Sequence, residues 1–486
     1  MPHPLATSCR FLARSLTRTL VLLPLITMLA GATALCASSA ARSSGEQKAA
    51  NGFGPGVETR LASSTEPAAY TVRTGPAWTI RVPVPGRSST ETTTVTTPTA
   101  SPTNTSAPPS AVVPQIPLFW LHLNSTAVTD AQLATEAKRR AYIVLNAWEG
   151  ALISKLKAAN PSVQVFVYKD LSSTRSYACH NGVDDAQLPT GIGYCDASRN
   201  HPEWFLLSPA GQRLQYSGYS GHWQMDIGNV AYQNAWADAV ISASKASGFD
   251  GVLMDNALFS CATYHDNVCP ARYPTDASIQ TAYKAMFANT RAKFTSAGLK
   301  TVANLANARL YAGGWNAYTT NLDGGFDEWW LTFSDTNRLP EYSEGWSRQL
   351  AEISANEARG KITWVQPHFS DSAQAPFRYA LASFLMVSGP RSAFSPVART
   401  DGYGDPPQWR SEYTWRLGAP SGSYRAIATN LFRRDFACGM VLVNANPAGA
   451  ATSTVPLGGT YTDEAGRTVT SVRLAGTSGS ILRRSC

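Results

Sequence analysis

Short apolar runs alternate with amphipathic segments along the chain from residue 116 onward. The runs are rich in β-branched and aromatic residues, which is typical of buried β-strands. They cover residues 117–123, 141–148, 163–170, 249–256, 300–307, 324–331, 361–368 and 391–397. We expect each of these eight runs to form one strand.

Two of the intervening segments have clear helical periodicity. In 276–297 the apolar residues fall at helical spacing, and Gly298 is placed to end the helix. The segment 229–247 has the same spacing before Gly248. Repeated units of strand and helix predict an α/β fold, a (β/α)8 TIM barrel over residues 113–409. A doubly wound open sheet is the alternative, but no glycine-rich phosphate-binding motif follows the first run.

After about residue 410 the pattern changes to apolar runs without helices. The runs are GMVLVNAN, TSTVPLGGTYTD, TVTSVRLAG and GSILRRS, and turn residues separate them. This pattern predicts a small C-terminal antiparallel β-sandwich over residues 410–486.

The beginning of the chain lacks both patterns. Residues 1–41 contain arginines, then an apolar run and small residues, which predicts a secretory signal peptide; an uncleaved N-terminal anchor is the alternative. Residues 42–112 are rich in Ser, Thr and Pro and predict a linker or stalk. We therefore expect a secreted or cell-surface protein with no transmembrane span after the signal.

Composition narrows the expected partners. The 486 residues are 44% hydrophobic and include 13 Trp, 19 Tyr and 17 Phe, a content that suits a packed core and sugar-stacking surfaces. The net charge is +8, but no run of Lys or Arg forms a stripe that would follow phosphates. We expect a monomer that does not bind nucleic acid.

Six cysteines remain after Cys9 and Cys36, which fall in the predicted signal peptide. Six allow 15 connectivities, and pairing of neighbours in the sequence predicts three disulfides. These are Cys179–Cys195, Cys261–Cys269 and Cys438–Cys486. A metal site is the rival idea, but no C-x-x-C or H-E-x-x-H motif is present, and an exported protein favours disulfides. We expect no metal and no cofactor.

The run FDGVLMDN, residues 249–256, carries an aspartate near each end. In a TIM barrel the C-terminal ends of the strands build the active site, whereas the N-terminal ends serve stability. Side chains alternate along a strand, so Asp255 shares a face with Leu253 and with Gly251, which is small enough for a crowded barrel interior. We predict that Asp255 points into the barrel mouth and that Asp250 is structural.

The run GGFDEWWL, residues 324–331, supplies a second carboxylate. Alternation groups Glu328 with Phe326 and Trp330 and turns Asp327 away. Asp255 beside a polar asparagine suits an ionised carboxylate, and Glu328 beside tryptophans suits a protonated one, as a glycosidase requires. The predicted spacing allows the ~5–5.5 Å of a retaining pair and the ~6.5–9.5 Å of an inverting pair. A capping or ion-pairing role at the strand ends is the alternative.

Polar and aromatic residues at neighbouring strand ends are candidate substrate contacts. They are Tyr168, Lys169, Asp170, Asn256, Asn304, Trp330, Gln366 and His368. Aromatic rings with a few convergent polar groups are typical of sugar sites. For each of these residues, packing or capping is the alternative role.

Five segments, considered together, carry a resemblance to a known family. They are HPEWFLLSPAGQRL (201–214), MDIGNVAYQNAWAD (225–238), GFDGVLMDN (248–256), GMVLVNANP (439–447) and VPLGGTYTDEAGR (455–467). With them the chain resembles the glycoside-hydrolase-like family 15 over about residues 116–486 and, more distantly, the endo-α-1,4-polygalactosaminidases. The resemblance implies Asp255 as nucleophile and Glu328 as acid/base. The insertion 171–200 departs from the family's minimal barrel.

The favoured function is therefore a secreted glycoside hydrolase that cleaves an α-linked polysaccharide with two carboxylates, in a retaining mechanism. The alternative is a non-catalytic barrel that binds carbohydrate or cell wall, since fold alone does not fix function. The presence of both carboxylates favours the enzyme. A metal-dependent hydrolase or deacetylase is less consistent with the sequence, because its seven histidines are scattered.

Overall fold

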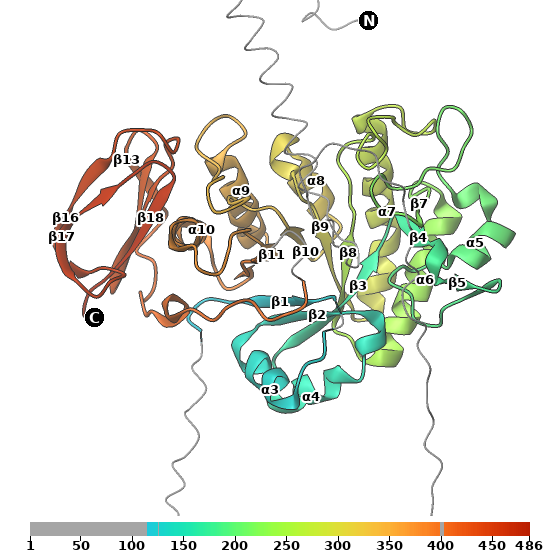
Figure 1. The fold of residues 1–486 in the computed structure, drawn as a ribbon, viewed down its shortest axis with the longest axis horizontal. Helices are drawn as coiled ribbons and strands as arrows, with labels where there is room; N and C mark the ends of the chain where they lie inside the picture. The colour runs from blue at the N-terminus through green and yellow to red at the C-terminus, as the bar shows by residue number, and fades with distance from the viewer. Residues whose placement is uncertain (1–113, 125, 399–402) are drawn as a thin grey trace, which may run out of the picture. The chain divides into compact units, whose positions relative to one another are not determined.

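The computed structural model describes residues 114–124, 126–398 and 403–486. The predicted signal peptide and linker lie outside the described residues. A barrel of parallel strands and a C-terminal antiparallel sheet make up the described part (Figure 1). In this part of the chain, no helix combines the length and the apolar character that a bilayer span needs.

Parallel strands form the barrel. They are β1 (Phe119–His122), β2 (Tyr142–Leu145), β3 (Gln164–Asp170), β8 (Gly251–Asp255), β9 (Lys300–Asn304), β10 (Gly324–Asp327), β11 (Ile362–Val365) and β12 (Ser392–Phe394). They are hydrogen-bonded in this order. Leu118, just before β1, forms a parallel bridge with Phe394 of β12, which closes the ring. All eight predicted strands are confirmed, and the open doubly wound sheet is wrong.

Helices lie around the strands in Figure 1. They are α3 (Asp130–Arg139), α4 (Leu152–Ala159), α6 (Val230–Ser247), α7 (Asp276–Ser296), α8 (Gly314–Thr319), α9 (Trp346–Ala358) and α10 (Gln374–Val387). The two periodic segments are confirmed as α6 and α7. Thr275 caps α7 by accepting a hydrogen bond from the backbone of Ser278. Helix α6 ends at Gly248, whose φ of 83° suits a residue without a side chain.

The barrel interior is filled by side chains that alternate with those facing the helices. In β8, Leu253 packs inside with Phe166, whereas Val252 and Met254 belong to the cluster beneath the helices. Gly251 has to be small, because an added Cβ would lie 2.4 Å from a ring carbon of Phe166. The alternation predicted for this strand is confirmed.

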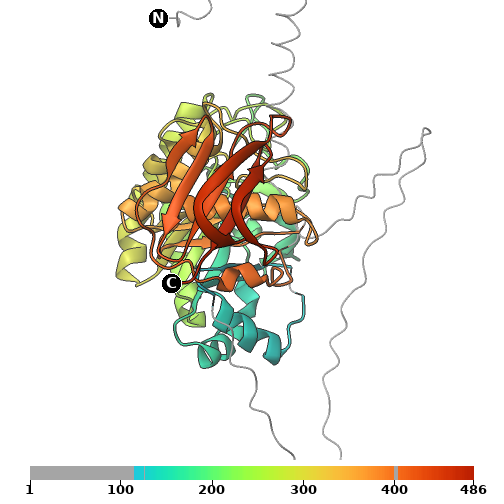
Figure 2. The same cartoon turned by 90° about the vertical axis from the view of Figure 1, so that its left-hand side faces the viewer.

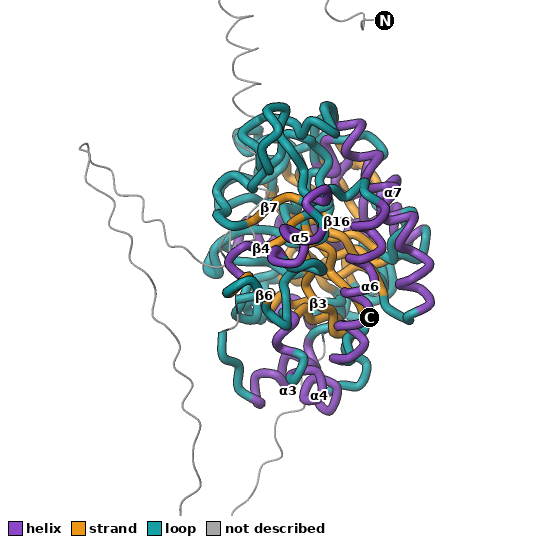
Figure 3. Tube along the Cα trace, turned by 90° about the vertical axis from the view of Figure 1, so that its right-hand side faces the viewer, coloured by secondary structure: helices purple, strands orange, loops and turns teal. Residues whose placement is uncertain are grey.

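The segment between β3 and α6 contains short strands and helices, of which β4, β6, β7 and α5 are labelled in Figure 3, and it shares its apolar core with the barrel. It contains β4 (Ser173–Arg175), β5 (Cys179–His180), β6 (Val183–Asp184), α5 (Tyr194–Asn200) and β7 (His222–Gln224), with short 3-10 turns at Ser176–Ala178 and Pro202–Trp204. Strands β4 and β7 pair in antiparallel fashion. The disulfide Cys179–Cys195 ties β5 to α5. The predicted insertion is therefore an ordered, cross-linked element.

The C-terminal strands form one antiparallel sheet in the order β13-β14-β15-β18-β16-β17. The strands are β13 (Arg425–Ala428), β14 (Leu431–Phe436), β15 (Gly439–Asn444), β16 (Ser453–Thr462), β17 (Thr468–Leu474) and β18 (Ser478–Arg483). Val441 and Ile481 pack in a cluster shared with α10, while Met440 and Leu482 face the sheet's own core. Figure 2 shows this sheet in front of α10. The predicted antiparallel domain is confirmed, with its first strand at residue 425.

The other structural predictions concern the disulfides and Asp250. All three predicted disulfides are present: Cys179–Cys195, Cys261–Cys269 and Cys438–Cys486. Asp250 lies before β8, where its Oδ2 accepts hydrogen bonds from Lys157 Nζ at 2.6 Å and the backbone nitrogen of Val165 at 2.7 Å. Asp250 therefore has the structural role that was predicted for it.

Candidate active site

Two carboxylates lie at the C-terminal ends of barrel strands. Asp255 is the last residue of β8, and Glu328 directly follows β10. Each is only 1% exposed. Leu253 and Phe326, two residues earlier on the same strands, belong to the barrel interior, so the carboxylates continue the inward face. The structure thus brings together the two acids that alternation predicted.

One amide group joins the two acids. Asn304 ends β9, which lies between β8 and β10, and its Nδ2 donates to Asp255 Oδ1 at 3.0 Å and to Glu328 Oε2 at 2.8 Å. Its Oδ1 accepts from the backbone nitrogen of Ala306, which fixes the orientation of the amide. Because the bonds of 3.0 Å and 2.8 Å start from the same nitrogen, Asp255 Oδ1 and Glu328 Oε2 are at most about 5.8 Å apart.

Each acid also accepts a hydrogen bond from a tyrosine hydroxyl. Tyr168 of β3 donates to Asp255 Oδ2 at 2.7 Å. Tyr403, which follows β12, donates to Glu328 Oε1. Each of the four carboxylate oxygens therefore has a hydrogen-bond donor, and both side chains are held in fixed orientations.

Burial raises the pKa of both acids. Desolvation is the largest cause, and it raises the pKa of Asp255 to about 6 and that of Glu328 to about 8. The charge of Asp170 adds to the pKa of Asp255, and the charge of Asp255 adds to that of Glu328. Hydrogen bonds from the tyrosines and the shared amide oppose both increases. Burial therefore raises the pKa of Glu328 further than that of Asp255, so Asp255 is the acid that ionises first.

Asp170 and Asn256 form a polar cluster beside Asp255. Asp170 is opposite Asp255 in the pairing of β3 with β8 and is fully buried. Its Oδ2 accepts from Arg175 at 2.9 Å and from Asn256 Nδ2 at 2.9 Å, and its Oδ1 accepts from the backbone of Ser172. Asp170 is thus engaged within the protein and orients Asn256, which lines the cleft described below.

Two predicted substrate contacts lie elsewhere. Lys169 alternates with Tyr168 on β3 and donates to the carbonyls of Leu188 and Thr190, so it anchors the insertion; burial lowers its pKa to about 8. Trp330 is fully buried and contacts Phe384 of α10. The prediction that it shares the face of Glu328 is wrong, because the chain bends at Glu328 and Trp329, and Trp330 packs with the residues of α10.

Gln366 and His368 lie beyond the end of β11. Gln366 directly follows β11, is 1% exposed, and its Oε1 has no hydrogen-bond partner among the described residues. His368 Nε2 lies 2.7 Å from the carbonyl oxygen of Glu328, and its ring stacks on Trp329 with centroids 3.7 Å apart. His368 therefore supports the backbone that carries Glu328.

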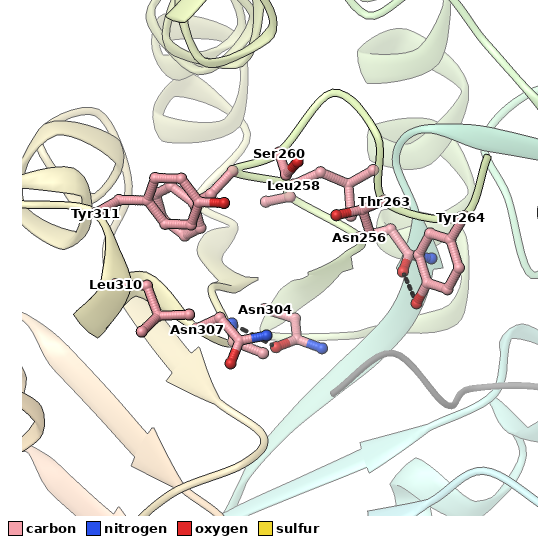
Figure 4. Close-up of a pocket in the computed structure, with 12 residues that line it drawn as sticks. Asn256, Leu258, Ser260, Thr263, Tyr264, Asn304, Asn307, Leu310 and Tyr311 are labelled. Carbon is pink, nitrogen blue, oxygen red and sulfur yellow. Dashed lines mark hydrogen bonds between the residues drawn. The ribbon is translucent and has the colours of Figure 1, made fainter. Parts of the chain in front are cut away.

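A cleft opens next to the acids, on the side of the loops that follow β8 and β9 (Figure 4). It has an empty volume of about 480 Å³ that includes open solvent. It is lined by Asn256, Ala257, Leu258, Phe259, Ser260, Thr263, Tyr264, Asn304, Ala306, Asn307, Leu310 and Tyr311. In Figure 4, Tyr311 and Tyr264 lie on opposite sides, with Asn304 and Asn307 between them. Asn304 lines the cleft and also donates to both acids.

Sequence reasoning missed Tyr403, Tyr264 and Arg175. Tyr403 and Tyr264 stand in loops without periodicity, and Arg175 belongs to the insertion. The sequence carries one indirect signal, since Tyr264 lies inside the loop closed by Cys261–Cys269, next to the strand end at Asp255.

The structure holds no convincing set of metal ligands in its described part. Cys179, Asp184 and Cys195 come close enough to surround an ion. Both sulfurs, however, form the disulfide, and Asp184 accepts hydrogen bonds from the backbone nitrogens of Cys195 and Asp196. This group therefore serves structure.

Comparison with known families gives the class of protein. The sequence profile of hypothetical glycosyl hydrolase family 15 matches residues 157–440, more than half of the chain and a range that includes both acids. The chain belongs to this family and is by class a glycoside hydrolase. No curated protein matches the chain in sequence.

Several solved glycosidase structures are similar to the chain. The glycoside hydrolase domain of PelA from Pseudomonas aeruginosa has 13% identity and a TM-score of 0.39, with 60% of this chain and 98% of that one covered. Ega3 of Aspergillus fumigatus, solved with galactosamine, has 11% identity and a TM-score of 0.38, with coverages of 63% and 100%. The α-amylase of Geobacillus thermoleovorans, solved with acarbose, has 9% identity and a TM-score of 0.41, with coverages of 76% and 99%.

Proposed function

We propose that this glycoside hydrolase cleaves α-linked bonds of an extracellular polysaccharide with retention of configuration. The observation that carries the mechanism is the amide bridge, which keeps the bridged carboxylate oxygens within about 5.8 Å. Retaining enzymes hold their two carboxyl groups ~5–5.5 Å apart, whereas inverting enzymes need ~6.5–9.5 Å to admit a water molecule. The resemblance to endo-α-1,4-polygalactosaminidases favours α-linkages.

In the first step, the carboxylate of Asp255 attacks the anomeric carbon. The bond to the leaving oxygen breaks, and that oxygen takes the electron pair of the bond together with the proton of Glu328. In the second step, Glu328 removes a proton from water, the water oxygen bonds to the anomeric carbon, and Asp255 leaves as a carboxylate. The lower pKa of Asp255 supports its role as nucleophile, and the higher pKa of Glu328 supports its role as acid/base.

The surrounding groups have supporting roles in this proposal. Tyr168 and Asn304 hold the attacking carboxylate, and Tyr403 holds the acid on its other oxygen. The buried Oε1 of Gln366 is an acceptor that suits a hydroxyl of the substrate. A non-catalytic carbohydrate-binding role is less consistent with this site, because binding alone does not need two acids held in opposite protonation states.

We further propose that the protein works outside the cell. The three disulfides favour an oxidising compartment, and the predicted signal peptide supplies the route.

The test is a panel of α-linked and β-linked polysaccharides incubated with the purified protein. Sizing the products separates endo from exo action, and proton NMR of the first products reads their anomeric configuration. Hydrolysis of an α-linked polymer with retention is the expected result. Products of inverted configuration would contradict the mechanism, and cleavage of β-linked polymers alone would contradict the linkage.

A further inference from the structure

The segment that carries Tyr403 is attached to the end of β1 through two successive backbone carbonyls. The carbonyl of Tyr403 accepts a hydrogen bond from the backbone nitrogen of Leu123. The carbonyl of Gly404 accepts from Trp120 Nε1 at 3.0 Å and lies 2.9 Å from His122 Nδ1. The three donors belong to β1 or directly follow it. This strand therefore fixes the backbone at Tyr403 and directly after it.

His122 lies between the Gly404 carbonyl and a carboxylate. It ends β1 and is fully buried, and its Nε2 is 3.0 Å from Oε1 of Glu149, which ends the 3-10 turn after β2. Oε2 of Glu149 accepts two hydrogen bonds from Asn146, which suits an ionised carboxylate. Because a carbonyl oxygen only accepts, Nδ1 of His122 carries a proton, and the carboxylate beside Nε2 favours a second one. The imidazole is therefore a buried cation whose charge is balanced by Glu149.

The charges around His122 support this state. Burial lowers the pKa of His122, but Glu149, the carbonyl of Gly404 and the charge of Asp405 together raise that pKa above its usual value. A hydrogen bond from a charged donor is stronger than one from a neutral donor. The charged ring is therefore a strong anchor for the Gly404 carbonyl.

The position of Tyr403 matters because its phenol acts on the pKa of Glu328. Burial and the charge of Asp255 raise the pKa of Glu328, and the hydrogen bond from Tyr403 opposes this increase by stabilising the ionised form. Tyr403 is 5% exposed and packs with Leu121 in the barrel interior, so its ring has little freedom apart from its backbone. A shift of this segment would weaken the hydrogen bond and raise the pKa of Glu328 further.

We propose that His122 is a positioning residue for Glu328: held by Glu149, it fixes the Gly404 carbonyl and thereby keeps the phenol of Tyr403 on the acid/base. The inference rests on the proposed function for the role of Glu328. The His122 ring packs against Trp120, which belongs to the cluster beneath the helices. His122 therefore acts on the site from outside the barrel interior.

The pKa of Glu328 is measured by carbon NMR of the full chain with labelled glutamate carboxyl carbons, and Glu328→Gln assigns the resonance. His122→Gln keeps a polar partner for Glu149 but has no donor at the position of Nδ1. The pKa of Glu328 should therefore rise by about one pH unit, as expected for a weakened hydrogen bond to a charged group. His122→Asn, whose Nδ2 can take the place of Nδ1, should restore most of the difference. An unchanged pKa in His122→Gln would overturn the proposal.

Tyr403→Phe tests whether His122 acts through the phenol. This variant should raise the pKa of Glu328 by itself, and His122→Gln in the Tyr403→Phe background should then add little. A further rise of the same size in the double variant would show that His122 acts in another way and would overturn the assignment.

Two other variants separate positioning from general stability. Trp120→Phe removes the other side-chain donor to the Gly404 carbonyl and should raise the pKa of Glu328 in the same direction. Asn356→Leu is the control, because Asn356 is fully buried on α9 and donates to the carbonyl of Ile362 at the start of β11. It should lower the melting temperature and leave the pKa of Glu328 unchanged. An equal rise in this control would contradict a specific role for His122.

Activity gives a second readout and separates this inference from the proposed function. On a polysaccharide that the wild-type protein hydrolyses, His122→Gln should lower kcat by about tenfold with KM little changed. Hydrolysis by the wild-type protein, with neither kcat nor the pKa of Glu328 altered in His122→Gln, would overturn the inference and leave the function intact. The expected rise in pKa, in a protein that hydrolyses no glycan, would support the inference and contradict the function.

Discussion

Asp255 and Glu328 are joined through a single hydrogen-bond donor, the side-chain nitrogen of Asn304. Because Asn304 ends the strand between theirs, the spacing of the two acids is set by the barrel itself. Asn304 also couples the charges of the two acids, because the same amide nitrogen stabilises a negative charge on either of them. We therefore expect the reaction to require one protonation state of the pair, with Asp255 ionised and Glu328 protonated.

The rate should therefore follow a bell-shaped pH profile. Attack needs Asp255 ionised, so kcat/KM is expected to fall below a pH of about 6, and proton donation needs Glu328 protonated, so it should fall above about 8. Initial rates over this range on the best polysaccharide of the panel give the profile. In Glu328→Gln the alkaline limb should be lost. If the alkaline limb persists unchanged in this variant, the limb reports the titration of a group other than Glu328.

Asn304→Ala should slow the chemical step more than it weakens binding. Loss of a preorganised donor at a reacting charge typically costs about 10²–10³ in kcat. The pKa of both acids should rise further without the amide, so the acidic limb of the profile moves to higher pH. Steady-state kinetics across pH measure both effects. A lower kcat with an unmoved profile would limit Asn304 to a packing role.

Gln349 of α9 is a positioning residue for Glu328. Its Nε2 donates to Asp327 and, at 3.0 Å, to the carbonyl of Trp329, while its Oε1 accepts from the backbone of Leu331 at 2.9 Å. Gln349→Leu frees the turn that carries Glu328, so kcat should fall by about 10–100-fold with KM little changed.

The matched control for Gln349→Leu is Gln233→Leu. Gln233 is equally buried on α6, where it donates to the carbonyl of Ile227 and accepts from Asn289. Both variants should lower the melting temperature, but only Gln349→Leu should lower kcat. Equal losses of kcat in the two variants would make the effect one of general stability.

Glu328 also links stability to pH. Its folded-state pKa lies above the value of about 4.3 for an unfolded chain. The folded protein therefore holds the proton more tightly, and this stabilisation is present below about pH 4 and is lost as the pH rises toward about 8. Glu328→Gln should raise the melting temperature relative to wild type at pH 8 and change it little at pH 4. A variant that melts lower at both pH values would contradict this linkage.

The barrel and its two acids were predictable because their signals are local. Each strand is an uninterrupted apolar run, and alternation fixes the face of Asp255 from Gly251 and Leu253, without knowledge of any partner. The same rule failed at Trp330 because the strand stops at Asp327, and Leu331 takes a φ of 57° that no pattern of apolar residues encodes.

The partners of the acids depend on contacts between distant parts of the chain. Tyr403 reaches Glu328 across 75 residues, and Tyr168 reaches Asp255 across 87. Lys169 was misassigned for a related reason, because its carbonyl partners belong to the insertion, whose path the sequence does not reveal. Strand patterns give the positions of the acids but not the groups that set their pKa values.

The most direct test is the turnover of Asp255→Asn on the polysaccharide that the wild-type protein hydrolyses. The amide keeps the shape of the side chain and removes the attacking charge, so hydrolysis should nearly vanish while folding and substrate binding remain. Asp250→Asn, at the other end of the same stretch, is the matched control and should lower the melting temperature while leaving kcat unchanged. A stable Asp255→Asn protein with near-wild-type turnover would contradict the assignment of Asp255 as the nucleophile.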